Sequence, residues 1–128
     1  MILVDTSIWI ELLNGQLGSS LSEEDLFNFA TCGPVVQEVL QGLRDLSAAA
    51  AFRETFLALP VLGDPLSVNT FQAAAEIYRQ GRNKGYTIRS SVDCLIAAIA
   101  IEHQTPIWHK DRDFDILERF TTLRIYSR

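Results

Sequence analysis

The chain has 128 residues, of which 48% are hydrophobic and 21% are charged, and its net charge at pH 7 is −5. These values are typical of a globular domain with a sizeable core, so we expect a single domain over residues 1–128. The longest apolar run is the eight residues of Cys94–Ile101, which is too short to span a bilayer. No basic segment leads into an apolar one at the N-terminus, and we expect a cytoplasmic protein without membrane contact.

The acid excess lies in the first half of the chain. Residues 1–64 hold nine acidic and two basic residues, whereas residues 65–128 hold seven acidic and nine basic ones. The acidic net charge argues against a protein that coats nucleic acid. All the charged residues between Glu76 and Asp93 are basic, namely Arg79, Arg82, Lys84 and Arg89. This run fits either a helix end in water or an edge that contacts phosphates, and the charges alone favour the helix end.

The two cysteines, Cys32 and Cys94, lie far apart, each in a largely apolar segment. Neither has the spacing of a metal ligand pair. We interpret both as buried thiols in a reducing compartment, without a disulfide between them.

The first half of the chain predicts one strand at its start and several helices. Residues 2–4 are apolar and precede Asp5, and Thr6-Ser7 fits a helix N-cap. Helices are expected over Thr6–Leu13, from Ser22 onward, after Pro34 and over Ser47–Leu59. Residues 26–30 fit either a helix end or a short strand, and residues 61–62 form a short extended piece.

The second half alternates helices with strands. A long amphipathic helix is expected from Val68 to Gly81 or a little beyond, and a second one from Ser90 or Ser91 to about residue 103. The strand 106–108 follows, then a helix from residue 111 to about 120 and a last strand over 123–126. Short strands separated by helices predict an α/β fold with a parallel sheet covered on both faces.

Four acids occupy comparable places in this scheme. Asp5 follows the first strand, Asp111 follows the strand 106–108, and Asp93 lies in the first turn of an apolar helix. Glu38 lies in the helix after Pro34. In an open parallel sheet, the carboxyl ends of the strands and the helices that follow them meet at one rim, where ligands bind. We therefore expect these acids to approach one another.

Carboxylates that share a cleft repel each other, by about 4 kcal/mol for two charges ~4 Å apart at an effective dielectric of 20. Divalent cations relieve this repulsion, and oxygen-rich sites suit Mg²⁺ or Mn²⁺. Such a cation can activate water for attack on phosphorus. The acids thus indicate hydrolysis of a phosphodiester.

Each acid also has an ordinary explanation. Asp5 and Asp111 fit helix caps, Ser90 and Asp93 fit a capping box, and Glu38 fits an exposed helix acid or the partner of an arginine. Each explanation suffices for one residue, whereas four acids at one rim favour a site.

Four blocks in this sequence, MILVDTS, CGPVVQEVLQGL, SSVDCLIAAIA and WHKDRDF, resemble those of a PIN-domain ribonuclease, specifically a VapC-type toxin of a toxin–antitoxin pair. The resemblance implies a three-layer α/β/α sandwich with a mostly parallel central sheet. It implies catalytic roles for Asp5, Glu38, Asp93 and Asp111, and metal ligation by Asp5, Asp93, Asp111 and Asp113. It also gives Thr6 a supporting role beside the first acid.

The same resemblance implies Mg²⁺ or Mn²⁺ as cofactor and endonucleolytic cleavage of RNA to a 5′-phosphate and a 3′-hydroxyl. It implies a homodimer and a cognate VapB-type antitoxin as partner. By chemistry alone, the candidate RNA contacts are Arg79, Arg82, Lys84, Arg89, Lys110 and Arg112. The family block before D-x-D-F often ends in threonine, whereas His109-Lys110 stands here. We expect His109 to be a partly exposed residue at a strand end, and both tryptophans, Trp9 and Trp108, to lie in the core.

Two alternatives stay open at this point. A phosphatase of the haloacid dehalogenase type also places an aspartate after its first strand, but it requires D-x-D there, and Ser7 stands at the second position. A non-catalytic PIN-like module that binds RNA or protein would be expected to lack some of the acids, and here all positions are filled.

Overall fold

The computed structural model describes residues 1–15, 21–43 and 49–127. In these ranges the strands are β1 (Ile2–Val4), β2 (Phe29–Cys32), β3 (Val61–Leu62) and β4 (Ile107–Trp108). The helices are α1 (Thr6–Leu13), α2 (Glu23–Phe27), α3 (Gly33–Gln41), α4 (Ala50–Leu57), α5 (Val68–Asn83), α6 (Ser91–Glu102) and α7 (Arg112–Phe120).

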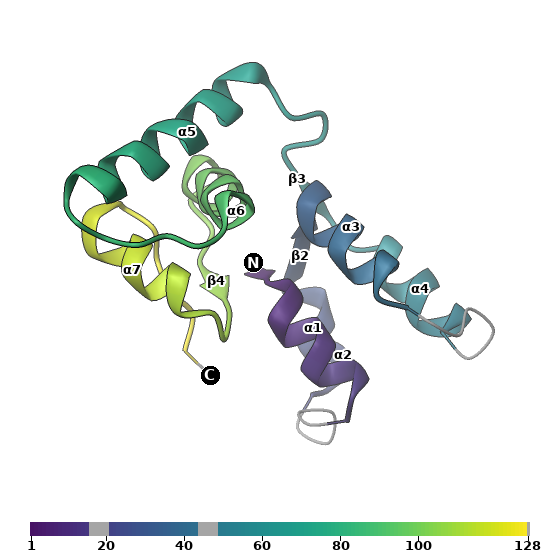
Figure 1. Cartoon of the computed structure of the whole chain (residues 1–128). Coiled ribbons are helices and arrows are strands. Elements are labelled where there is room, and N and C mark those ends of the chain that lie inside the picture. Colours follow the sequence, from purple (N-terminus) through teal and green to yellow (C-terminus); the bar gives the residue numbers. More distant parts are fainter. Residues whose placement is uncertain (16–20, 44–48, 128) are drawn as a thin grey trace.

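The strands form one parallel sheet in the order β3-β2-β1-β4. Leu3 of β1 pairs with Ala30 on one side and with Ile107 on the other. Helices connect every pair of successive strands, with α1–α4 on one side of the molecule and α5–α7 on the other (Figure 1). The predicted class, a central parallel sheet flanked by helices, is confirmed.

Strand β2 resolves the segment that the sequence left open. Helix α2 ends at Phe27, and the four residues Phe29–Cys32 form a strand in which every residue is buried. Strands β1 and β3 pair with its two edges, and both of its faces are buried, so its sequence shows no alternation of apolar and polar residues.

The predicted last strand over residues 123–126 is wrong. The structure has one parallel bridge there, between Ile107 and Ile125. Two hydrogen bonds hold this bridge, from the Ile107 N–H to the Arg124 carbonyl at 2.9 Å and from the Tyr126 N–H to the Ile107 carbonyl at 2.8 Å. Since β4 itself has only two residues, it offers too short an edge for a longer partner. The helix predicted over Ser47–Leu59 is observed as α4, and its predicted start at Ser47 lies outside the described residues.

An aromatic cluster fixes α1 against the sheet. The Trp9 ring makes edge contacts with Phe29, Phe52 and Phe56 at centroid distances of 5.2–6.0 Å. Its indole Nε1 donates a hydrogen bond to the Val4 carbonyl at 3.2 Å. Both tryptophans lie in the core and both cysteines are buried free thiols, as predicted. The turn that contains Asp5 is thereby held between a buried strand and a packed helix.

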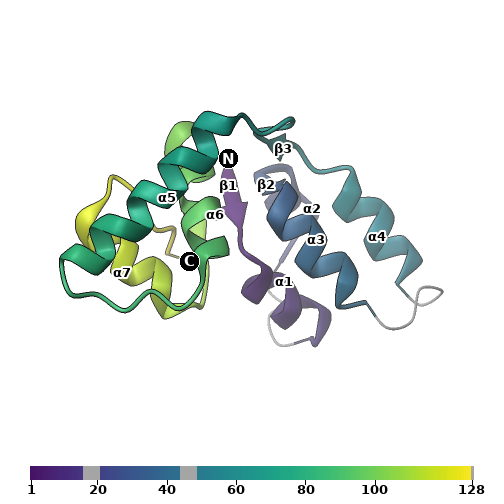
Figure 2. The same cartoon turned by 45° about the horizontal axis from the view of Figure 1, so that its top comes forward.

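Helix α6 is enclosed by its neighbours. It contacts α5, α7 and α3, and β1 runs between α6 and α3 in Figure 2. This enclosure explains why seven of its residues are buried and why it is apolar on nearly all sides. No helix in the described ranges is long and apolar enough to cross a membrane. Because its neighbours enclose α6, they also hold its N-terminal end in a fixed position at the rim of the sheet.

We predict that Phe56→Ala destabilises the protein by about 3–5 kcal/mol, because it removes a buried ring and leaves a cavity beside Trp9. Phe27→Ala is the matched control, since the Phe27 side chain is 84% exposed and its loss should change stability by less than about 0.5 kcal/mol. Urea unfolding of the two variants measures both values. Equal losses would contradict the packing described here.

Candidate metal centre

Carboxylates from three elements converge at the carboxyl ends of β1 and β4. Asp93 enters from the start of α6, and Asp111 and Asp113 enter from the start of α7. Oxygen atoms of these three residues lie within 4.8 Å of one another. Asp5, at the end of β1, is close enough for the charge of Asp111 to raise its pKa. We call these four residues the acid cluster.

Asp93 lacks one of the two bonds of a capping box. Ser90 caps α6 by accepting a hydrogen bond from the Asp93 N–H at 3.3 Å. The reciprocal donor, the Ser90 N–H, instead donates to Asp113 Oδ2 at 3.2 Å. Helix α2 provides a comparison, because Ser22 and Asp25 make both bonds there. Capping therefore does not account for the Asp93 carboxylate, whose Oδ2 is buried without a hydrogen-bond partner among the described residues.

Burial and neighbouring charge keep this carboxylate from ionising easily. Burial raises the pKa of Asp93 from its ordinary value of 3.8 to about 8, with further contributions from the charge and hydrogen bond of Asp111 and from the charges of Asp5 and Asp113. Burial likewise raises the pKa of Asp5, against the lowering effect of its bonds to Ser7. A cluster of this kind binds protons or a cation.

Asp113 ties two elements together. Its Oδ2 accepts hydrogen bonds from the backbone N–H groups of Arg89 and Ser90, at 3.0 and 3.2 Å. The side chain thus anchors the start of α7 to the segment that leads into α6. Its Oδ1 is buried and has no partner among the described residues. One oxygen of Asp113 thus has a structural role, and the other makes no hydrogen bond to the described residues.

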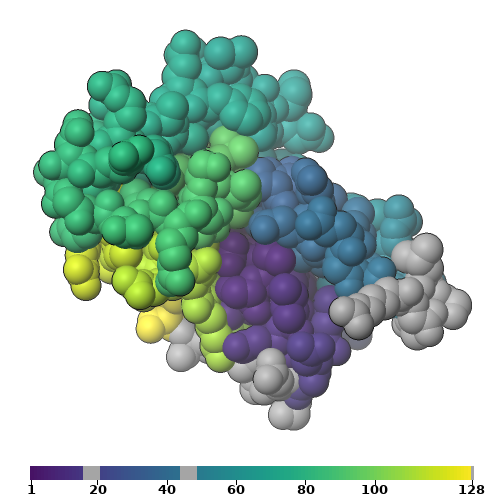
Figure 3. Space-filling model, in the orientation of Figure 1, coloured from purple at the N-terminus to yellow at the C-terminus, as the bar shows by residue number. Residues whose placement is uncertain are grey.

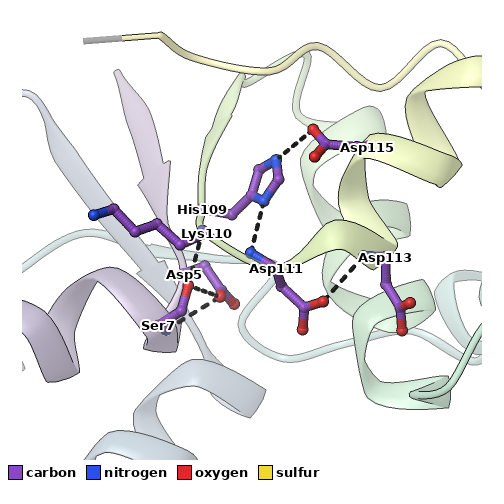
Figure 4. A network of polar contacts seen from close by, with 7 residues as sticks. All are labelled: Asp5, Ser7, His109, Lys110, Asp111, Asp113 and Asp115. Atoms are coloured by element: carbon purple, nitrogen blue, oxygen red, sulfur yellow. Dashed lines mark hydrogen bonds and ion pairs between the residues drawn. The ribbon is translucent and has the colours of Figure 1, made fainter.

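Asp5 is held by Ser7, a residue that the sequence reading treated only as part of a helix cap. Asp5 Oδ2 accepts hydrogen bonds from the Ser7 N–H at 3.1 Å and from Ser7 Oγ at 2.6 Å. Ser7 Oγ in turn accepts from the Lys110 N–H at 3.1 Å (Figure 4). The N-terminal segment therefore lies against the segment around residue 110 (Figure 3). The D-x-S spacing signals the cap, but no local pattern signals a contact across 103 positions.

Glu38 also lies near Asp5, since the charges of both reach the Cys32 thiol. It is half-buried on α3, and its Oε1 accepts a hydrogen bond from Thr6 Oγ1 at 3.0 Å. Both Glu38 and Asp5 act on the thiol of Cys32, whose pKa burial raises to about 12 with smaller contributions from these two charges. Glu38 is therefore at the same rim but outside the group formed by Asp93, Asp111 and Asp113.

The six cations predicted to contact RNA are all exposed. Arg79 and Arg82 lie on α5, Lys84 and Arg89 lie between α5 and α6, Lys110 lies between β4 and α7, and Arg112 is the first residue of α7. Arg79 pairs with Glu76 at 3.1 Å, and Lys110 pairs with Glu11 at 2.7 Å. Arg89 and Arg112 adjoin the acid cluster directly, because Asp113 binds the Arg89 N–H and Arg112 stands between Asp111 and Asp113.

His109 is partly exposed as a residue, as expected, but its side chain is buried. The imidazole is only 4% exposed and packs against Phe114 at a centroid distance of 5.0 Å. Both ring nitrogens face polar atoms of the same segment, the Asp111 N–H and the Asp115 carboxylate. The ring is drawn inward because its apolar face meets a wholly buried phenylalanine.

Residues 2–119 match the family described as PIN domain. The chain is 39% identical over 133 residues to VapC ribonuclease Mb1587 of Mycobacterium bovis, and the match covers 99% of this chain and 98% of that protein. It is similar in the same measure to ribonuclease VapC11 of Mycobacterium tuberculosis.

Solved structures share the fold. VapBC2 from Rickettsia felis, bound to a DNA fragment from its promoter, matches with a TM-score of 0.74 at 19% identity, over 98% of both chains. VapBC-1 from nontypeable Haemophilus influenzae matches with a TM-score of 0.69 at 16% identity, over 98% of this chain and 97% of that one. Given the match over residues 2–119 and the near full-length relatives, this chain belongs to the PIN domain family.

Proposed function

We propose that this protein is a divalent-metal-dependent endoribonuclease, the toxin of a toxin–antitoxin pair, and that Mg²⁺ or Mn²⁺ binds the acid cluster. The observation that supports the metal is a pair of buried carboxylate oxygens, Asp93 Oδ2 and Asp113 Oδ1, which have no hydrogen-bond partner among the described residues. Buried anions of this kind are stable only when they are paired or bound to a cation. The donors are all oxygens, which fits Mg²⁺ or Mn²⁺ and not a thiolate-seeking metal. The ribonuclease names of near full-length relatives support the substrate.

In this proposal, each acid has a role set by its surroundings. Asp93, Asp111 and Asp113 hold the cation, and Asp5 completes the ligand set or acts through a water molecule. Glu38, oriented by Thr6, helps to place the water that attacks the phosphodiester. When bound, the cation would act as a Lewis acid that withdraws negative charge from the scissile phosphate. Cleavage would leave a 5′-phosphate and a 3′-hydroxyl.

RNA binding would use the exposed cations near the cluster. Arg89 and Arg112 adjoin the acids in the chain and are the first candidates for contact with the scissile phosphate. The other four candidates, Arg79, Arg82, Lys84 and Lys110, would contact flanking phosphates. Lys110 would first have to exchange its ion pair with Glu11 for one with phosphate.

We further propose that residues 1–128 form one PIN domain that works in the cytoplasm, dimerises and is held inactive by a VapB-type antitoxin. One continuous core with contributions from all the strands and most helices supports a single domain. The two VapBC complexes of the same fold support the antitoxin. The homodimer stays a prediction.

Expression of this chain alone should arrest bacterial growth, and expression together with its antitoxin, to be sought in a small open reading frame adjacent to the gene, should restore growth. Sequencing of cellular RNA ends during arrest should then reveal new 5′-phosphate ends at defined sites. Growth that is unaffected by the chain, or arrest without new RNA ends, would contradict the toxin role.

Asp5→Asn and Asp93→Asn should each lower the rate of RNA cleavage by about 100-fold or more, because each removes a ligand charge worth several kcal/mol to the transition state. Asp25→Asn is the matched control, since Asp25 also lies at a helix start but serves the capping box of α2. Circular dichroism should show that all three variants are folded.

Cleavage by Asp93→Asn at the wild-type rate, with metal present, would refute the site. Wild-type protein that binds Mn²⁺ and RNA without cutting would indicate the non-catalytic module instead. Turnover of a small phosphate ester in place of RNA would indicate the phosphatase.

The metal-free protein should lose stability as the pH rises from about 4 to about 8. In this window an unfolded chain has already released the Asp93 proton, whereas the folded chain retains it because the folded pKa is about 8. Raising the pH therefore favours the unfolded state, and Asp5 acts in the same direction.

In EDTA at about pH 8, we expect Asp93→Asn to melt about 4 °C or more above wild type, the shift that about 1 kcal/mol produces in a domain of this size. Mn²⁺ should raise the melting temperature of wild type more than that of the variant. If the stability of the two metal-free proteins depended on pH in the same way, the pKa of Asp93 would not be raised in the folded protein.

A further inference from the structure

The segment from His109 to Asp115 contains a chain of polar contacts that the family blocks do not account for. The Asp111 N–H donates a hydrogen bond to His109 Nδ1 at 3.0 Å. His109 Nε2 lies 3.3 Å from Asp115 Oδ1. Figure 4 shows the imidazole between these two groups, one on each side of the ring.

The hydrogen bond fixes the form of the ring. A backbone N–H can donate only to a ring nitrogen that carries no hydrogen, so Nδ1 is the bare nitrogen and Nε2 holds the proton. Nε2 lies 3.3 Å from Oδ1 of Asp115, whose side chain is 62% exposed. The packing against Phe114 holds the plane of the ring. The exposed carboxylate, the buried ring and the backbone of Asp111 thus form one connected unit.

This unit contacts Asp111 through its backbone. Asp111 is the N-cap of α7, with its Oδ1 bound to the Asp113 N–H at 3.0 Å. Its backbone N–H is held by His109, and the preceding N–H, that of Lys110, is held by Ser7. Two consecutive backbone groups are therefore fixed by side chains on either side, and the Asp111 carboxylate is left to face Asp93.

We propose that His109 is a positioning residue of the metal centre, which holds the backbone of Asp111 through Nδ1 and is itself oriented by Asp115. The inference rests on the proposed function, because it gives a role toward a metal to residues that do not touch it. Groups that orient metal ligands in this way contribute about 10- to 100-fold to metal affinity.

Two substitutions separate the hydrogen bond from the packing. His109→Asn retains an acceptor, since an asparagine oxygen can bind the N–H two residues later in an Asx turn. His109→Leu retains an apolar side chain but has no acceptor. We expect His109→Asn to bind Mn²⁺ within about threefold of wild type and His109→Leu to bind about tenfold more weakly, by calorimetry. Should His109→Leu fail to fold, His109→Gln takes its place. The carboxamide oxygen of glutamine lies one bond further from the backbone than the acceptor of histidine or asparagine, so it is displaced from the position that binds the Asp111 N–H.

A measurement without metal tests the bond itself. Amide hydrogen exchange at Asp111 should be protected in wild type and His109→Asn and faster in His109→Leu. Asp115→Ala should weaken Mn²⁺ binding in the wild-type background and add nothing in the His109→Leu background, as expected when one residue acts through the other.

Equal Mn²⁺ affinities for wild type and His109→Leu would overturn the positioning role while leaving the metal site intact. Equal losses in the asparagine and leucine variants would also overturn it, because packing alone would then explain both. Additive effects of Asp115→Ala and His109→Leu would remove Asp115 from the unit. Wild-type protein that binds no Mn²⁺ would refute the proposed function, and with it the metal role of His109.

Discussion

The site depends on one constraint, the burial of several carboxylates with too few hydrogen-bond donors to satisfy them. Asp93 and Asp113 each hold a buried oxygen without a partner among the described residues. Burial and the neighbouring acids raise the pKa of Asp93, which reflects the free-energy cost of ionising a buried carboxylate. A fold selected for stability alone would replace such groups with neutral ones. Their presence at the rim of the sheet is therefore best explained by a ligand that supplies positive charge.

The fold supports this constraint with contacts that fix the acids from outside. The packed Trp9 holds the turn of Asp5 against β1, and the enclosed helix α6 brings Asp93 to the rim. Asp113 removes the Ser90 N–H from the capping box and so leaves the Asp93 carboxylate uncommitted. Ser7 and His109 then fix the backbone between β4 and α7. The cluster is thus organised before any cation binds, which lowers the cost of binding.

Local patterns predicted much of this arrangement. The apolar run before Asp5 and the helix starts at Ser90 and Asp111 are where the sequence predicted them, whereas the N-cap of α1 is Asp5 and not Thr6-Ser7. What local patterns missed depends on distant partners. Phe29–Cys32 is a strand because it pairs with β1 on one edge and with β3 on the other, and residues 123–126 form only a bridge because β4 is short. Likewise, the capping box of Asp93 stays half-formed because of Asp113, 20 positions later.

Anomalous diffraction from crystals soaked in Mn²⁺ tests the central claim most directly, because it locates the cation without relying on catalysis. We predict one strong anomalous peak at the acid cluster, about 2.0–2.6 Å from carboxylate oxygens of Asp93 and Asp111. The oxygens that lack partners should face that peak. A map with no peak there at saturating Mn²⁺ would contradict the account.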